Sequence, residues 1–431
     1  LRIEDTDKIR SNNEFKNNII DELNWMGFHH DDEPYIQSER IKRHQEVALD
    51  LLENNKAFKC ICKPAELEKK RNENMKKHTN VKRLCTKCEN SHDVQKLKNG
   101  YVIRIKIPNS ENITLTDLVQ GGITVENQEI DNFIILRNDG TPTYMLAVVV
   151  DDFDMGVNLI IRGDDHLNNS FRQFYIYKNM HWPIPQYAHI PLIHGEDGKK
   201  LSKRHGVLNI SEFKEKGYLQ EAIINNLILL GWAPSNDDEI ISLENAIKWF
   251  SLEKIGKSPA KFDNEKLISV NSHYIKELNN DEIIKFLESY YISKYKIKID
   301  EISIKRLNLG LNDIKSRSRD LNQLAEMSLF YCSKFPLSIS KKAQKYIKIV
   351  DKTIFKDLLV VLGNIENDFK KQKIEEIMSK FLTEKGLKLS DIIQYIRAMI
   401  TGLDVSPRIY DIMEILGFLE IKKRIENFIH G

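Results

Sequence analysis

The chain has 431 residues, of which 41% are hydrophobic and 30% are charged, and its formal net charge is only +2. This length exceeds one ordinary hydrophobic core, so roughly two to four domains are expected. The balanced charge excludes a polybasic nucleic-acid coat, and any RNA contact must come from local basic patches. No apolar run is long enough to span a bilayer and no signal peptide is recognisable, so we expect a cytoplasmic protein that makes no membrane contact.

The first part of the chain alternates strand and helix patterns. The opening residues LRIED are typical of the end of a strand, a helix follows and closes at Gly27, and a second helix is predicted over about 38–54. Between about 58 and 100 lysines are dense and hydrophobic periodicity is weak, which predicts an insertion. Strand patterns then follow at 101–107, 113–118 and 133–137.

Three further segments predict a parallel sheet. Residues 144–150 form a continuous apolar run that ends in two aspartates, residues 158–162 lead into Gly-Asp-Asp, and residues 187–193 follow a helix of about 168–180. In a doubly wound parallel sheet, the binding site lies at the carboxyl ends of the strands, and Gly, Asp and His at those ends fit this arrangement. After about residue 206 the pattern is helical to the end, which predicts a separate all-α half.

Four of the five cysteines cluster within the predicted insertion. Cys60 and Cys62 form a C-x-C pair, and Cys85 and Cys88 form a C-x-x-C pair, with His92 as a spare ligand. In a reducing compartment such a cluster indicates a structural zinc site of four ligands. The alternative is four reduced thiols that bind no metal.

A basic loop at residues 198–206, with the sequence GKKLSKRHG, carries the sharpest chemical signal. Its flanking glycines allow movement, and Lys200 and Lys203 place two compact positive charges where a polyphosphate could sit. Mobile cations that meet the charge on a departing pyrophosphate lower the barrier of an adenylate-forming reaction. The alternative is a solvated basic loop, which a lysine-rich string favours when taken alone.

Several stretches together resemble the bacterial glutamyl-tRNA synthetases, which are class I aminoacyl-tRNA synthetases. Residues 199–206 are similar to the KMSKS-type loop of this family, and residues 1–7 (LRIEDTD) resemble the segment after its first helix. Residues 139–152 (DGTPTYMLAVVVDD) and 162–169 (RGDDHLNN) resemble two more of its stretches. The similarity is colinear as far as about residue 274 and continues more weakly through the helical half.

The resemblance implies a binding site for glutamate. Glu4 matches the acidic residue near the amino group of the bound amino acid, Tyr144 matches a pocket tyrosine, and Arg162 matches a pocket arginine suited to a carboxylate. Each side chain also has a structural alternative: Glu4 as a loop cap, Tyr144 as a core aromatic, and Arg162 in an ion pair with a nearby aspartate.

The resemblance also implies a nucleotide site. Asp165, His166 and Leu192 match positions around the adenosine of ATP, and Lys203 matches the ATP-binding lysine of the mobile loop, with Lys200 beside it. The implied reaction joins L-glutamate to the 3′ end of tRNA(Glu) through glutamyl-adenylate, with ATP and Mg²⁺. Charging of tRNA(Gln) is open, and members of the family are usually monomers.

The fold that follows is an α/β catalytic domain with a Rossmann-like parallel sheet, an inserted α+β domain for the tRNA acceptor end, and an all-α anticodon-binding half. The expected domains are catalytic at 1–57 and 147–205, inserted at 58–146, linking and helical at 206–278, and anticodon-binding at 279–431.

The family's HIGH motif is expected before Leu1, so we interpret the sequence as an N-terminal truncation that would not activate glutamate as given. One alternative function is a glutamyltransferase acting on a modified tRNA nucleoside, although such proteins lack the helical half. Another is a non-catalytic tRNA-binding remnant.

Overall fold

The structure is a computed structural model that describes residues 1–6, 13–76, 85, 87–108, 111–195, 197–201, 209–234, 238–333, 337–347 and 352–430. It contains two compact units, one made of Leu1–Val207 with Leu227–Asp263 and the other of Leu208–Asn226 with Asn264–Gly431. The predicted division into four domains is finer than these two units and stays a prediction.

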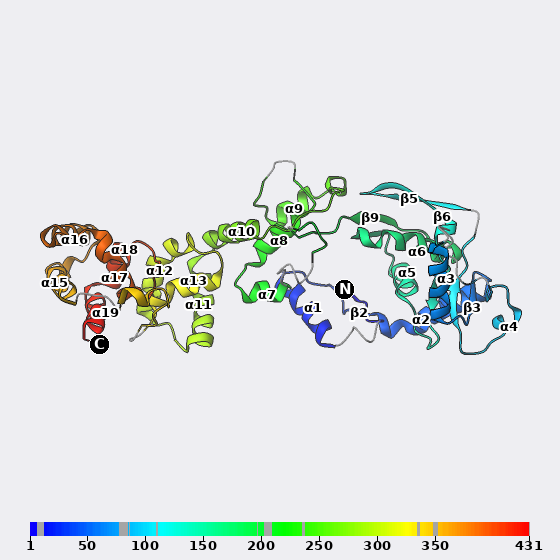
Figure 1. The fold of residues 1–431 in the computed structure, drawn as a ribbon, viewed down its shortest axis with the longest axis horizontal. Helices are drawn as coiled ribbons and strands as arrows, with labels where there is room; N and C mark the ends of the chain where they lie inside the picture. The colour runs from blue at the N-terminus through cyan, green and yellow to red at the C-terminus, as the bar shows by residue number, and fades with distance from the viewer. Residues whose placement is uncertain are drawn as a thin grey trace. The chain divides into compact units, whose positions relative to one another are not determined.

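The first unit combines short strands and helices, as the alternating patterns predict (Figure 1). Its elements are β1 (Arg2–Ile3), α1 (Asn13–Trp25), β2 (Tyr35–Ile36), η1 (Gln37–Arg40), α2 (Ile41–Glu53), β3 (Ala57–Cys60), α3 (Pro64–Lys76), α4 (His92–Gln95), β4 (Val102–Ile105), β5 (Asn112–Asp117), β6 (Gly121–Glu126), η2 (Asn127–Glu129), β7 (Ile134–Leu136), α5 (Tyr144–Asp154), β8 (Leu159–Gly163), η3 (Asp164–His166), α6 (Leu167–Asn179), β9 (Gln186–Ile190), α9 (Leu243–Trp249) and η5 (Leu252–Lys254).

Parallel strands form the framework of the predicted catalytic region. β1 pairs in parallel with β2, and β8 pairs in parallel with β9 in the register Ile161 with Ala188. The four-stranded sheet has the order β6-β5-β9-β8, and β5 joins β9 in parallel where Asp117 faces Tyr187. Figure 1 shows the β5–β6 hairpin beside β9. A separate antiparallel sheet contains β3, β4 and β7.

Residues 144–150 are helical, and the prediction of a strand there is wrong. They form most of α5, whose residues from Leu146 to Asp152 are all buried. The helix contacts both α2 and α6, so its sides are covered and its sequence shows no polar stripe. A short run that is apolar all round fits a buried helix as well as a buried strand, so periodicity alone does not separate the two.

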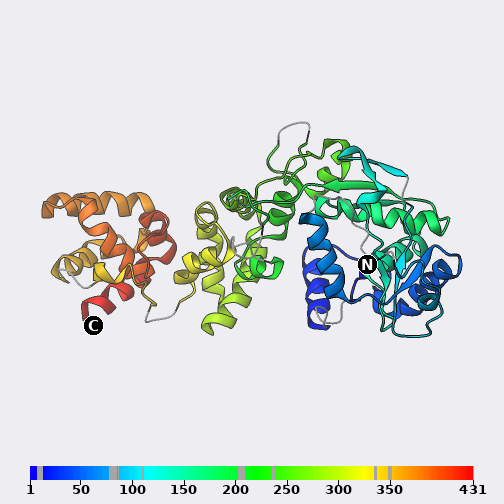
Figure 2. The ribbon, with the colours of Figure 1, turned by 45° about the vertical axis from the view of Figure 1, so that its right-hand side comes forward.

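The second unit is built from helices, which confirms the predicted all-α half (Figure 2). α8 (Gln220–Ile228) begins in this unit and runs past its boundary at Asn226. The other elements are α7 (Ile210–Glu215), α10 (Asn264–Glu277), α11 (Asn280–Tyr295), α12 (Glu301–Lys315), α13 (Leu321–Ser328), η6 (Leu329–Tyr331), α14 (Gln344–Ile347), α15 (Lys352–Gly363), η7 (Glu366–Asp368), α16 (Lys371–Lys385), α17 (Leu389–Thr401), α18 (Ile409–Leu416) and α19 (Phe418–His430).

The apolar faces of these helices share one core. On α11, Ile283, Leu287 and Tyr291 recur every fourth residue and are all buried. α12 comes unusually close to this core at Gly310, where an added Cβ would lie 2.4 Å from the Tyr331 hydroxyl. Among the residues that the structure describes, no helix is both long and apolar enough to cross a bilayer.

Candidate active site

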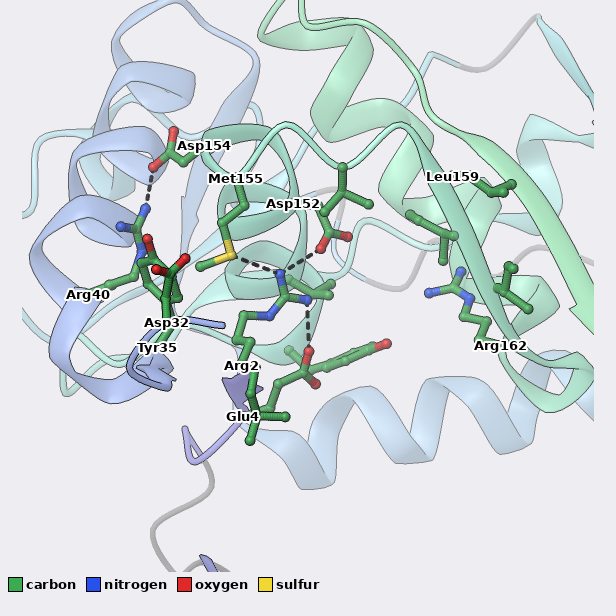
Figure 3. A pocket seen from close by; sticks show the side chains of 16 residues that line it. Arg2, Glu4, Asp32, Tyr35, Arg40, Asp152, Asp154, Met155, Leu159 and Arg162 are labelled. Atoms are coloured by element: carbon green, nitrogen blue, oxygen red, sulfur yellow. Dashed lines mark hydrogen bonds and ion pairs between the residues drawn. The ribbon is translucent and has the colours of Figure 1, made fainter. Parts of the chain in front are cut away.

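A cavity of about 870 Å³ in the first unit brings together the three residues expected to bind glutamate. Glu4 follows β1, Tyr144 begins α5, and Arg162 lies in β8, and all three line this cavity. Figure 3 shows their surroundings: Arg2 lies between Glu4 and Asp152, and Arg162 points in from β8. The cavity therefore has charged groups of both signs on its wall.

Arg2 holds two carboxylates at the edge of this cavity. Its Nη1 donates to Asp152 Oδ1 at 2.7 Å, and its Nη2 donates to Glu4 Oε1 at 3.0 Å. Burial raises the pKa of Asp152, and the positive charge of Arg2 opposes that shift. The carboxylate of Glu4 therefore forms an ion pair with Arg2 beside the cavity, rather than the loop cap considered as its structural alternative.

Arg162 is oriented by three polar side chains behind it. Its Nε donates to His189 Nε2 at 3.1 Å, and its Nη2 donates to Ser170 Oγ at 2.7 Å and to Gln173 Oε1 at 2.9 Å. None of these three bonds uses Nη1, and the guanidinium also interacts with the hydroxyl of Tyr144, which lines the same cavity. The alternative was that Arg162 forms an ion pair with a nearby aspartate. The three side chains that it contacts here are neutral groups instead.

Tyr144 connects this cavity to the residues expected around ATP. Burial raises the pKa of its hydroxyl, and the nearby Arg162 guanidinium opposes the shift. Its ring centroid lies 5.9 Å from that of His166, which ends η3 directly after β8. The amino-acid and nucleotide residues of the prediction therefore adjoin each other.

The expected nucleotide residues gather at the carboxyl end of β8. Lys200 Nζ lies 2.8 Å from Asp165 Oδ2, and this contact lowers the pKa of the Asp165 carboxyl. Gly163 is packed against the same group: an added Cβ would lie 2.8 Å from Asp165 Oδ1 and 3.4 Å from Leu192 Cδ2. Lys203, the second lysine of the predicted loop, lies outside the described residues.

The start of the basic loop folds back on the segment after β9. His194 forms an antiparallel bridge with Lys200, and the Leu201 N–H donates to the Ile193 carbonyl at 2.9 Å. These backbone contacts bring the Lys200 side chain to β8. Lys200, at the start of the loop, therefore lies at the carboxyl end of β8, beside Asp165.

The four clustered cysteines converge on one point. Their Sγ atoms all lie within 4.8 Å of one another, with Cys85 at 3.2 Å from both Cys60 and Cys62, and Cys62 at 3.5 Å from Cys88. A tetrahedral zinc ion with sulfur ligands at about 2.3 Å requires sulfur separations of about 3.8 Å, so the four thiols fit this ion. His92 begins α4 and is not a member of the cluster.

Comparison with known proteins decides the family. Residues 1–269 match the family described as tRNA synthetases class I (E and Q), catalytic domain. The chain belongs to this class I tRNA synthetase family. Residues 269–429 of the synthetase match the anticodon binding domain family, in agreement with the helical second unit.

Similar proteins extend over almost the whole synthetase. It is 42% identical to glutamate–tRNA ligase 2 of Zymomonas mobilis over 99% of its own length and 89% of that protein, and 41% identical to glutamate–tRNA ligase 2 of Rickettsia felis over 99% and 91%. A crystal structure of a glutamate tRNA ligase from Elizabethkingia meningosepticum, in complex with its amino acid, aligns with a TM-score of 0.82 at 28% identity, covering 100% of the synthetase and 92% of that chain.

The sequence did not identify the groups that orient the predicted site residues of the synthetase. Arg2 stands within the LRIEDTD stretch, but the resemblance implies no role for it, and Asp152, considered as an ion-pair partner of Arg162, is instead paired with Arg2. His189 and its partner Asp117 are separated by 72 positions, and only the pairing of β5 with β9 brings them together.

Proposed function

We propose that this chain is a glutamate–tRNA ligase that activates L-glutamate with ATP and transfers it to the 3′ end of tRNA(Glu). The observation that carries the proposal is the adjacency of two sets of residues at the end of β8. Glu4, Tyr144 and Arg162 line one cavity, and Asp165 and Lys200 form an ion pair just beyond it. Family membership and the matching anticodon-binding region support the same function.

In the proposed first step, the ammonium group of glutamate faces Glu4 and a carboxylate faces Arg162. An oxygen of the α-carboxylate attacks the α-phosphorus of ATP, which forms glutamyl-adenylate and breaks the bond to pyrophosphate. Lys200 meets the phosphates by leaving Asp165. Breaking the ion pair between Lys200 and Asp165 costs little free energy, because an exposed ion pair contributes only about 0–1 kcal/mol. Mg²⁺, which accompanies ATP, shields the negative charge of the phosphates.

In the second step a hydroxyl group of the terminal ribose of tRNA attacks the acyl carbon, and AMP departs. No covalent bond to the enzyme is needed, so catalysis rests on positioning and on electrostatic stabilisation. We expect glutamate activation to require bound tRNA. The anticodon-binding region argues against a glutamyltransferase of modified nucleosides, because such proteins lack it.

The test is charging of tRNA(Glu) by the full-length gene product with radiolabelled glutamate, and with glutamine and aspartate as competitors. We expect glutamate alone to be transferred, and pyrophosphate exchange to depend on ATP, glutamate and tRNA. A Lys200→Met variant is expected to lose about tenfold or more in kcat with little change in the KM for glutamate. Transfer of glutamine in preference to glutamate would contradict the proposal.

Three finer properties belong to the same proposal. We expect a monomer that works in the cytoplasm with its tRNA substrate, and charging of tRNA(Gln) is a further candidate activity. Charging assays with purified tRNA(Glu) and tRNA(Gln) decide the tRNA specificity. Light scattering of the purified protein decides the oligomeric state.

We further propose that Cys60, Cys62, Cys85 and Cys88 hold a structural zinc ion. The separations of their sulfur atoms support this, and four protein ligands leave no open position for a substrate. The ion would brace β3 and the start of the predicted acceptor-end insertion. Elemental analysis is expected to find one zinc per chain, and protein purified without chelator that contains no zinc would refute the assignment.

A further inference from the structure

A buried chain of hydrogen bonds runs from the β5–β6 hairpin to Arg162. Asp117, at the end of β5, is 3% exposed, and its Oδ2 lies 2.6 Å from His189 Nδ1. His189 is completely buried, and its Nε2 lies 3.1 Å from Arg162 Nε and 3.2 Å from Ser170 Oγ. The chain therefore connects a carboxylate, an imidazole and the guanidinium that faces the cavity.

The chemistry of the three groups determines where the imidazole proton lies. The N–H group at Nε of Arg162 can only donate, so Nε2 of His189 must accept and carry no proton. The carboxylate of Asp117 can only accept, so Nδ1 of His189 must carry the proton. The neutral Nδ1–H tautomer satisfies both contacts, whereas the other tautomer would place N–H groups against each other at Arg162.

The charge states agree with this tautomer. Burial would raise the pKa of Asp117, but hydrogen bonds from the Gln120 N–H, from His189 and from the Val119 N–H together lower it, so the carboxyl is ionised. Burial lowers the pKa of His189, with Asp117 opposing and Arg162 reinforcing the shift. A neutral imidazole beside an ionised carboxylate is therefore expected at neutral pH.

The hairpin is firmly joined to the strand that carries His189. The Leu118 N–H donates to the Tyr187 carbonyl at 2.8 Å, and Gln120 Nε2 donates to the His189 carbonyl at 2.9 Å. The backbone N–H of His189 also donates to the Asp117 carboxylate at 3.1 Å. Asp117 is thus fixed relative to β9 by backbone contacts as well as by its contact with the imidazole.

We propose that Asp117 and His189 are positioning residues for amino-acid binding: Asp117 holds His189 as the Nδ1–H tautomer, and His189 holds Arg162 so that Nη1 faces the carboxylate of the substrate. The inference rests on the proposed function, because it assigns the cavity to glutamate. It gives the hairpin of the predicted insertion an indirect role in recognition of the amino acid, exerted through His189 and Arg162. Neither residue contacts the cavity in this arrangement.

The test is an Asp117→Asn variant of the full-length protein. The asparagine oxygen can still accept from the backbone of the turn, which directs its NH₂ group at Nδ1 of His189 and favours the wrong tautomer. We expect the KM for glutamate in pyrophosphate exchange to rise about tenfold or more, the scale of a lost hydrogen bond to a charged group, while the KM for ATP changes by less than about twofold. Equal changes in both KM values would overturn the proposal.

Nitrogen NMR of histidine-labelled protein gives a second readout that does not depend on an activity measurement. The His189 signal, assigned by its loss in His189→Gln, is expected to show a protonated Nδ1 and a bare Nε2 in the unmodified protein. A protonated Nε2 there would overturn the proposal by itself. In Asp117→Asn we expect the proton to move to Nε2.

A matched control is Glu111→Gln, which makes the same change from carboxylate to amide just before β5. Glu111 is paired with Lys178 at the surface and lies outside the chain of bonds, so both KM values should stay unchanged. Failure of the unmodified enzyme to use glutamate would instead refute the proposed function. An enzyme that uses glutamate but tolerates Asp117→Asn without a change in the KM for glutamate would refute only the positioning role.

Discussion

Replacement of Arg162 by lysine would preserve the positive charge of the cavity and remove the shape of the guanidinium. In the structure Nε contacts His189, and Nη2 contacts Ser170 and Gln173. A lysine side chain ends in one ammonium group, which cannot hold these three partners and also reach the cavity. Because His189 and Gln173 are both almost fully buried, the ammonium is expected to stay with them and withdraw from the substrate.

The expected loss is one hydrogen bond to a charged group, which contributes about 1.5–3 kcal/mol. Since about 1.4 kcal/mol corresponds to a factor of ten, the KM for glutamate should rise about 10- to 150-fold in tRNA-dependent pyrophosphate exchange. The KM for ATP should change by less than about twofold, because Lys200 and Asp165 are not in contact with the altered group.

Arg172→Lys provides the control for this substitution. Arg172 lies on α6 and forms a half-buried ion pair with Asp131, in which Nε donates to Oδ1 at 3.0 Å. The same chemical change there should leave both KM values within about twofold, since neither Arg172 nor Asp131 lines the cavity. The reasoning would be refuted if Arg162→Lys left the KM for glutamate unchanged, or if both KM values rose together.

Three other substitutions test separate parts of the molecule. Cys85→Ser should lower the zinc content measured by elemental analysis, because a hydroxyl is a much weaker ligand than a thiolate. Lys200→Met should raise the pKa of the Asp165 carboxyl toward its ordinary value, since the contact with Lys200 is the largest cause of its lowering; carbon NMR of labelled aspartate measures this. Gly310→Ala should lower the local stability of α12 by about 1–3 kcal/mol, because the added methyl group would overlap Tyr331. We expect faster hydrogen exchange in α12, and unchanged exchange would contradict the close packing of Gly310 against Tyr331.

The helical unit was predictable because its signal is local. On α17, Ile392, Ile396 and Ile400 recur at helical spacing and are all buried, so the sequence alone identifies the face that packs. The same periodicity rule failed at residues 144–150. Because α5 is buried between α2 and α6, it has no polar face, and its apolar residues do not recur at helical spacing. Local patterns thus locate amphipathic elements well and fully buried ones poorly.

The residues of the candidate site are predicted mainly by their resemblance to family motifs, and much less by periodicity or composition. Glu4, Tyr144 and Arg162 stand in stretches that resemble the family, and the structure places them around one cavity. The groups that orient them were not recognisable, because the link between Asp117 and His189 depends on a hairpin that joins a distant parallel strand. Such a pairing follows from the tertiary fold, and no short window of sequence contains it.

The segment between α2 and α5 contributes strands to two different sheets: β3, β4 and β7 form one, and β5 and β6 extend the other alongside β9. Excision of residues 58–146 to obtain a minimal enzyme would therefore strip two strands from the catalytic sheet and expose the edge of β9. A trimmed enzyme would have to retain residues 112–126, and chimaeras that exchange this segment between relatives should place their junctions outside that hairpin.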